Sequence, residues 1–254
     1  MSRRPNTNQM NRSPLRTLAA GALALGTLAT AEAQIGIGLR GGILTTSASF
    51  DDDETATEVL EEENVTGYTI GIPIEIAVSN VFSLQPEVNF QARGTSVLNE
   101  FDSEDGQPLS QSIERDINFV EIPFLVKLGY TTESFTVAAV AGPSWSYALS
   151  GTTTAGDVID DAEEIVESVA GEYDIDFDEE GYNRSQWGGH VGLQGGIPAG
   201  PGKIILDARY QFAFTTINEA DDNVNLEYSN ADTYETRERG FSATLGYMLT
   251  LGDY

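Results

Sequence analysis

The feature that most constrains this chain is a two-residue alternation of side chains that returns along almost its whole length. In residues 35–46, Ile35, Ile37 and Ile43 share one face, whereas glycines and Arg40 occupy the other. This period is that of a β-strand with one apolar face. The pattern recurs in eight segments, which are residues 35–46, 66–77, 84–93, 117–129, 135–147, 187–197, 206–214 and 241–251. Their lengths are close to the roughly 9 to 11 residues that a tilted strand needs to cross the hydrocarbon layer of a membrane.

The connections between these segments alternate strictly in length. The short connections are residues 78–80, 131–134 and 199–202, and the long ones are residues 48–65, 96–116, 150–184 and 218–237. Short turns at one end and long loops at the other are typical of an up-and-down barrel of the bacterial outer membrane. Both ends of the chain are then expected on the side of the short turns, which faces the periplasm.

Backbone chemistry favours the same fold. Hydrocarbon cannot satisfy a free N–H or C=O group, so only helices and closed barrels cross a membrane. No segment after residue 33 has the run of apolar residues that a spanning helix needs. We therefore expect an all-β fold, an eight-stranded antiparallel up-and-down transmembrane β-barrel. Outward aromatic residues near the long loops are expected to form an interfacial girdle; these are Tyr68, Trp145, Tyr147, Trp187, Phe212 and Phe214.

The N-terminal segment has the pattern of a secretory signal peptide. Its first sixteen residues carry four arginines and no acid, an apolar run follows in residues 18–30, and Ala31-Glu32-Ala33 has the small-x-small pattern of a cleavage site. We expect residues 1–33 to be removed before Gln34 and residues 34–254 to form one barrel domain in the outer membrane. The chain has no cysteine, which excludes a lipid-modified cysteine and a disulfide framework.

Charge excludes one class of partner. The formal net charge is −27, from 13 basic and 40 acidic residues, and removal of residues 1–33 takes four basic residues and one acid, which leaves about −30. Binding to nucleic acid depends on neutralising phosphates with Lys and Arg, so nucleic-acid partners are not expected. Most of the acids, 32 of them, lie in the four long connections.

The inward faces of the strands carry a balanced set of charges instead. Four are basic and four acidic, and the only histidine lies on the same face: Arg40, Arg93, Lys127, Arg209, Glu75, Glu87, Glu121, Asp207 and His190. A buried charge is tolerated when it is paired and hydrogen-bonded, so we predict an ion network that fills the lumen. The alternative is a role in conduction or gating, although an eight-stranded interior is about wide enough for side chains alone.

His190 also raises the possibility of a barrel enzyme. It is the one side chain that can change charge near neutral pH without a perturbed pKa. However, no distinctive serine or Asp-His pattern accompanies it, and a hydrolase would need a nucleophile or an acid beside a base. We therefore predict that the protein is not an enzyme.

The third long connection contains alternating carboxylates at Asp174, Asp176 and Asp178. These are candidate calcium ligands, but the run lacks the glycine and the spaced glutamate of a usual calcium loop. A solvated acidic surface is the favoured explanation of this run. We expect no other cofactor. The acidic loops would suit divalent cations, envelope polymer or another envelope protein as partners.

The C-terminal segment carries a further signal. Thr244, Gly246, Leu249 and Leu251 fit the polar-x-Gly-x-x-hydrophobic-x-hydrophobic pattern that the barrel assembly machinery reads. An ordinary alternating strand would sometimes fit as well. The expected partners are thus outer-membrane lipid and that machinery.

Two segments together resemble a known family. Residues 84–94, LQPEVNFQARG, and residues 117–127, INFVEIPFLVK, resemble the LxPExxYxxKG and YLEIPLLLKY strands of PorT-like outer-membrane β-barrels, with Arg93 where that family often has Lys. Residues 141–144 and 207–210 fit its fifth and seventh strands. The resemblance implies a non-enzymatic membrane barrel, in a family described as porin-like or linked to secretion.

These observations favour a barrel with a side-chain-filled lumen and a structural or surface-interaction role for its acidic outer loops. Three alternatives stay open: a narrow porin-like channel for ions or small solutes, a barrel enzyme, and a soluble secreted barrel that holds a ligand inside. The outward aromatic residues and the alternating loop lengths argue against the soluble barrel.

Overall fold

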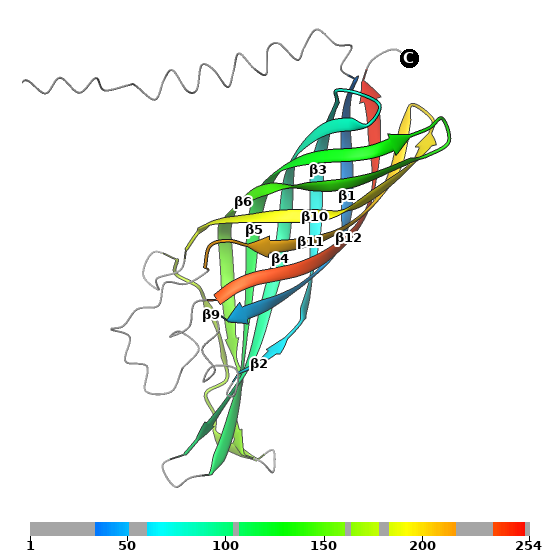
Figure 1. Ribbon diagram of the computed structural model, residues 1–254. Coiled ribbons are helices and arrows are strands. Elements are labelled where there is room, and N and C mark those ends of the chain that lie inside the picture. Colours follow the sequence, from blue (N-terminus) through cyan, green and yellow to red (C-terminus); the bar gives the residue numbers. More distant parts are fainter. Residues whose placement is uncertain are drawn as a thin grey trace, which may run out of the picture. The chain divides into compact units, whose positions relative to one another are not determined.

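The computed structural model describes residues 34–50, 60–103, 107–160, 164–177, 183–216 and 236–251; the predicted signal peptide lies outside them. Eight long strands dominate (Figure 1): β1 (Gln34–Phe50), β3 (Val65–Ala77), β4 (Phe82–Asp102), β5 (Pro108–Thr131), β6 (Thr136–Ala155), β10 (Ser185–Ala199), β11 (Gly202–Ala213) and β12 (Thr236–Leu251). In this part of the chain, no helix is long and apolar enough to cross a bilayer.

The eight strands close into an antiparallel barrel. The ring runs β1–β3–β4–β5–β6–β10–β11–β12 and returns to β1, because β1 pairs with both β3 and β12. Every strand therefore has two neighbours, and the main-chain groups of the barrel wall are satisfied by the ladder. The predicted fold class is confirmed.

The alternation read from the sequence separates an outer from an inner face. Outward side chains are apolar and exposed, as in Leu193 (64% exposed) and Leu245 (61%), whereas the inward carboxylates of Glu87 and Asp207 are 1% exposed. This is the inverse of a soluble barrel, whose apolar side chains point inward. The outer face is therefore suited to lipid.

Outward aromatic residues lie near both ends of the barrel. At the long-loop end they contact one another in pairs, such as Tyr68–Phe90 and Tyr210–Phe241. At the short-turn end lie Tyr130 and Phe135, which are not among the six residues predicted for the girdle. Phe135, which directly precedes β6, and Trp145 within it are ten residues apart, or roughly 25 Å across a membrane at a strand tilt of about 40°. That span equals the height of the apolar band of such barrels.

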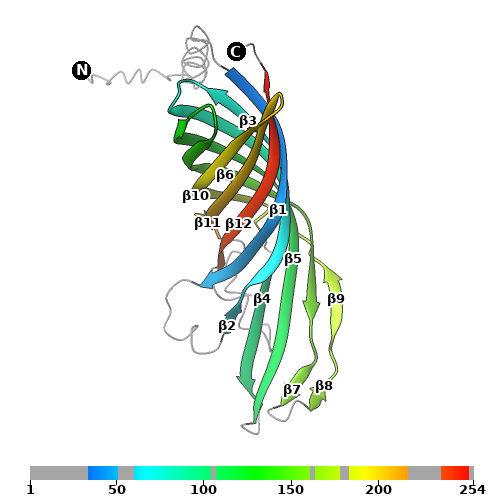
Figure 2. The same cartoon turned by 90° about the vertical axis from the view of Figure 1, so that its right-hand side faces the viewer.

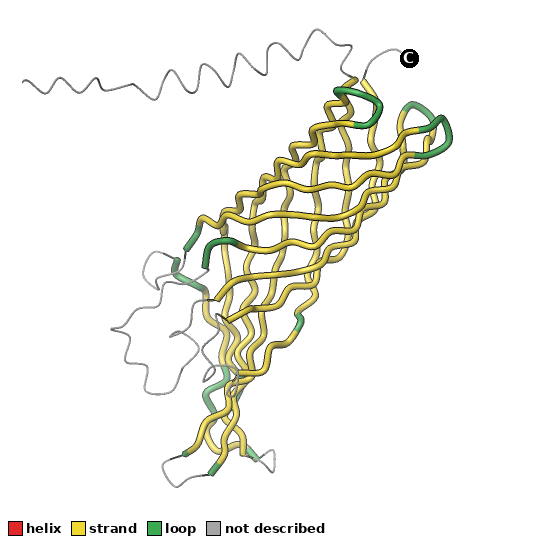
Figure 3. The backbone as a smooth tube through the Cα atoms, viewed as in Figure 1, coloured by secondary structure: helices red, strands yellow, loops and turns green. Residues whose placement is uncertain are grey.

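The prediction that residues 96–116 and 150–184 form loops is wrong for much of their length. Strands β4 and β5 stay paired over nine further residue pairs, from Gly94 opposite Asp116 to Asp102 opposite Pro108, which is roughly 30 Å of ladder. The connection itself is short. Figures 2 and 3 show this hairpin projecting beyond the rim of the barrel. Strands in water need no apolar face, so the alternation that marks a membrane strand is weak there although the hydrogen-bond ladder continues.

Four short strands widen this projection, which we call the extension. They are β2 (Leu60–Glu63), β7 (Val158–Asp160), β8 (Ile165–Glu167) and β9 (Gly171–Asp174). Strand β2 pairs with β4, β9 pairs with β6, and β7 links β5 to β8. At the rim, a register shift between β5 and β6 inserts Leu149, after which Gly151 faces inward. Such bulges are common at barrel rims, where they redirect a strand.

Candidate functional site

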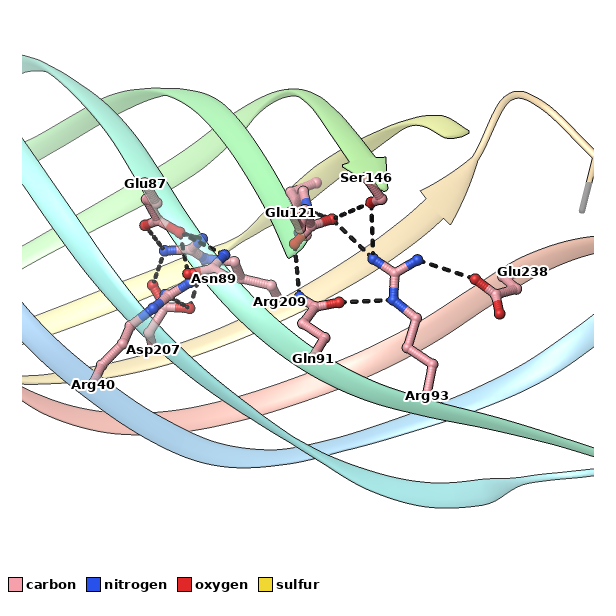
Figure 4. A network of polar contacts seen from close by, with 11 residues as sticks. Arg40, Glu87, Asn89, Gln91, Arg93, Glu121, Ser146, Asp207, Arg209 and Glu238 are labelled. Carbon is pink, nitrogen blue, oxygen red and sulfur yellow. Dashed lines mark hydrogen bonds and ion pairs between the residues drawn. The ribbon is translucent and has the colours of Figure 1, made fainter. Parts of the chain in front are cut away.

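Three clusters of polar side chains occupy the lumen along the barrel axis. We name them after their central carboxylates: the Glu121 cluster near the long-loop end, the Glu87 cluster in the middle and the Glu75 cluster near the short-turn end. Figure 4 shows the first two, which come from strands on different sides of the ring. Because the strands alternate, each inward position lies two residues from the next, and the clusters form successive layers.

The Glu87 cluster contains two arginines and two carboxylates. Arg209 donates to both carboxylate oxygens of Glu87, each at 2.9 Å, and Arg40 donates to Oε2 of Glu87 at 2.6 Å. Asp207 lies 2.6 Å from Arg209 Nε and 3.3 Å from Arg40 Nη1. Gln85 donates to the remaining lone pair of Glu87. The cluster is neutral and buried, which is the condition under which buried charges are tolerated.

The Glu121 cluster is organised by Arg93. The guanidinium donates to Glu121 at 3.1 Å, to Glu238 at 3.0 Å and to Gln91 at 2.7 Å. His190 Nε2 lies 3.0 Å from Oε1 of Glu121. Since a carboxylate oxygen can only accept, Nε2 carries the hydrogen of this bond. With His190 neutral, the cluster has one cation and two anions.

The Glu75 cluster contains two lysines around one carboxylate. Lys127 Nζ lies 2.8 Å and Lys203 Nζ 2.9 Å from the same oxygen, Oε2 of Glu75. Lys127 also donates to Gln194 at 2.5 Å, and Gln194 in turn donates to Asp207 at 2.9 Å. The Glu75 cluster and the Glu87 cluster are therefore joined.

An apolar cluster, which we call the cap, lies at the long-loop end of the lumen. It consists of Ile117, Phe119, Ala148, Ile175 and Phe177, all buried. Ile175 is held in place by its N–H, which donates to the carbonyl of Gly151 at 2.9 Å. The guanidinium of Arg93 stacks on the ring of Phe119 at 4.5 Å, so the cap rests directly on the Glu121 cluster. Only a cavity of about 20 Å³ remains beside that cluster, which is room for about one water molecule.

The short-turn end is open instead. A cavity of about 720 Å³ enters there and has Glu75, Lys127 and Lys203 in its lining. Its other walls carry hydroxyl and amide side chains, among them Ser79, Asn80 and Thr250. We call this cavity the vestibule; beyond it, the described residues Glu87, Asp207 and Arg209 are 1–2% exposed.

The nine residues predicted for the lumen all face inward and are buried in the structure. Every one of them takes part in one of the three clusters. Two charged partners among the described residues were missed, Lys203 and Glu238. Glu238 lies next to a segment predicted to be a loop, and Lys203 follows a short turn. If the two predicted strands are extended by a few residues toward their N-termini, the alternation places both side chains on the inward face. This alternation is the sequence signal that could have identified them.

The proposed calcium ligands are only partly described. Asp174 and Asp176 are exposed, and Asp178 lies outside the described residues. Within the described ranges, no group of three or more His, Cys, Asp or Glu residues is placed to hold a metal ion. The calcium site stays a prediction.

The chain is similar to several solved structures and to one family model. One similar structure is Ail of Yersinia pestis with the heparin analogue sucrose octasulfate, at 11% identity and a TM-score of 0.35, over 86% of this chain and 99% of that chain. Another is Neisserial surface protein A, at 12% identity and a TM-score of 0.38, over 85% of this chain and 97% of that chain. A third is OprG of Pseudomonas aeruginosa, at 11% identity and a TM-score of 0.41, over 87% of this chain and 98% of that chain. No curated protein matches it. The family model described as "Outer membrane protein beta-barrel domain" matches residues 23–219. Since that match covers most of the sequence, the chain belongs to this family of outer-membrane β-barrels.

Proposed function

We propose that this outer-membrane barrel is a closed, non-enzymatic anchor that carries the acidic extension outside the cell for contact with another envelope or surface molecule. The observation that carries the proposal is the combination of a filled lumen with an extended outer sheet. Arg209 and Glu87 meet across the lumen, the apolar cap packs on the Glu121 cluster, and strands β4, β5 and β6 continue past the rim. Neither the filled lumen nor the extended outer sheet is expected of a diffusion pore.

Export and family detail belong to the same proposal. The proposal includes a cleaved signal peptide at residues 1–33, periplasmic short turns and membership of the PorT-like branch. The motifs at residues 84–94 and 117–127 support the last of these. In this orientation the extension lies on the outer side of the membrane. Its described residues include the exposed acids Glu164, Glu167 and Glu172. Its charge favours a partner that is basic or that is bridged by divalent cations.

Exposed apolar side chains on the extension support a contact role. Ile165 and Val166 on β8 are 60% and 57% exposed, and Tyr173 on β9 is 60% exposed. They lie outside the barrel wall and therefore do not face the membrane. Apolar side chains flanked by charges are typical of a protein interaction site.

The interaction is tested by site-specific photo-crosslinking in cells. A photoreactive amino acid at Val166 should give discrete protein adducts, identified by mass spectrometry. The same label at Leu193, which faces outward within the barrel wall, should react with lipid only. Absence of adducts from the extension would sink the contact role.

The closed lumen is tested in planar bilayers. Purified protein should give no stable unitary conductance, and the Phe119→Ala variant should also stay silent because the Glu121 and Glu87 clusters beneath the cap still fill that part of the lumen. A stable single-channel conductance of the unmodified protein would contradict the closed barrel. It would support the alternative, a narrow channel for ions or small solutes.

A further inference from the structure

The sequence contains only two lysines, Lys127 and Lys203, and both line the open cavity. They come from strands β5 and β11. All other basic residues of the chain are arginines. An ammonium group is a compact, strongly hydrated point charge with three donors, whereas a guanidinium is a rigid fork that suits fixed bidentate pairs. The lumen thus uses arginine for its buried pairs and lysine where it opens to water.

Formal charges are unevenly distributed over the three clusters. The Glu87 cluster is neutral, with Arg40 and Arg209 against Glu87 and Asp207. The Glu121 cluster has one surplus negative charge when His190 is neutral. The Glu75 cluster has one surplus positive charge, because two lysines share one carboxylate oxygen. The surplus cation therefore lies at the end of the lumen that water can enter.

Glu75 needs only one lysine for charge balance. Lys127 is almost fully buried and already has two acceptors, Glu75 and Gln194. Lys203 is more exposed, at 21% of its side chain, and Glu75 is the one acceptor found for it among the described residues. Lys203 can thus donate to a further acceptor in the cavity.

The surroundings favour an anion as that acceptor. The cavity of about 720 Å³ has the size of small-molecule sites, and its walls offer hydroxyl and amide donors such as Ser79, Asn80 and Thr250. Glu133 is the only other described acid in its lining, and it is exposed in a turn at the rim. The acids of the extension lie at the opposite end of the barrel, beyond the roughly 8 Å over which charges act in physiological salt.

We propose that this vestibule binds a small oxyanion, a phosphate or a carboxylate, with Lys203 as its principal ligand and Lys127 as a second, buried source of positive charge. The bound anion neutralises the positive charge that remains when two lysines share the single carboxylate of Glu75. This inference rests on the geometry of the barrel and stands apart from the proposed contact role of the extension.

The two lysines make a direct test possible. Protein labelled with ¹³C only at lysine gives two side-chain Cε signals, and inorganic phosphate is titrated into it in phospholipid-free zwitterionic micelles at low salt. Phosphate should shift the signal of Lys203 in a saturable manner, with a smaller shift at Lys127. No saturable shift at either signal would overturn the proposal.

Matched variants distinguish a specific anion site from a non-specific attraction of phosphate to positive charge. In the Lys203→Met variant the shift at Lys127 should require at least tenfold more phosphate, whereas Lys203→Arg should retain binding because it keeps the charge. Glu133→Gln at the rim should bind phosphate at least as tightly as the unmodified protein. Unchanged binding by Lys203→Met would contradict the assignment, and heat-modifiable gel migration reports whether each variant is folded.

The source of the anion is distinguished by adding phosphatidylglycerol to the micelles. Displacement of phosphate by this lipid identifies a headgroup phosphate as the occupant. Binding of phosphate that is unaffected by the lipid identifies a soluble anion of the periplasm. Either result supports the site, since the same lysine ligands take part in both.

Discussion

Arg209 and Glu87 join opposite walls of the barrel by two parallel hydrogen bonds, from Nη1 to Oε2 and from Nη2 to Oε1, each 2.9 Å long. Their strands, β11 and β4, are four places apart in the ring of eight and therefore face each other across the lumen. Bidentate pairs of this kind are strong and geometrically specific. The pair occupies the middle of the lumen and ties the two walls together.

The Arg209→Met variant should lose about 3–5 kcal/mol of unfolding free energy, because it leaves the buried carboxylates of Glu87 and Asp207 without their main cation. Urea unfolding in lipid vesicles, followed by tryptophan fluorescence, measures this loss. As a control, Arg239→Met, which replaces an arginine exposed at the rim, should change stability by less than about 1 kcal/mol. Equal effects of the two substitutions would contradict the pairing across the lumen.

Gly42→Ala should prevent or strongly impair barrel closure, whereas Gly41→Ala should be tolerated. A Cβ at Gly42 would lie 2.0 Å from the carbonyl oxygen of Ala243 on β12, but one at the adjacent Gly41 would come no closer than 3.6 Å to the carbonyl oxygen of Thr69. The clash involves the main chain of a neighbouring strand, which cannot move without breaking the ladder. The fraction of heat-modifiable protein on detergent gels compares the two variants, and similar folding yields would refute the difference.

His190→Leu should destabilise the fold by about 1–3 kcal/mol, because Glu121 loses one of its hydrogen-bond donors in a buried site. His190→Gln can still donate from its amide and should retain most of the stability. The same unfolding assay compares them. A role in catalysis would instead make both variants equally defective in the cell at unchanged stability.

Protein purified from the outer membrane should have a mass that corresponds to a chain beginning at Gln34. Replacement of Ala33 by Arg removes the small residue at the predicted cleavage position and should leave the precursor uncleaved. Intact-mass spectrometry distinguishes the two forms. A mature chain that retains residues 18–30 would disprove the predicted signal peptide.

The sequence determined the wall of the barrel. The alternation on strands such as β3 and β12, and the short connections at residues 78–80 and 199–202, predicted eight antiparallel strands with an apolar outer face. These features are local, because a strand in a membrane must show lipid one face and the lumen the other along its own length. For the same reason the inward position of all nine lumen residues could be predicted.

Only the tertiary structure decided which charges meet and what the lumen leaves open. Most of the pairs join strands that are not neighbours, as in Arg209–Glu87 and Lys203–Glu75, so they depend on the register and closure of the whole ring. The sequence pattern also did not predict the extension, because strands in water need no apolar face. In addition, the acids of residues 96–116 resemble those of a loop. The surplus positive charge beside the open cavity follows from these long-range pairings, and no local pattern in the sequence reveals it.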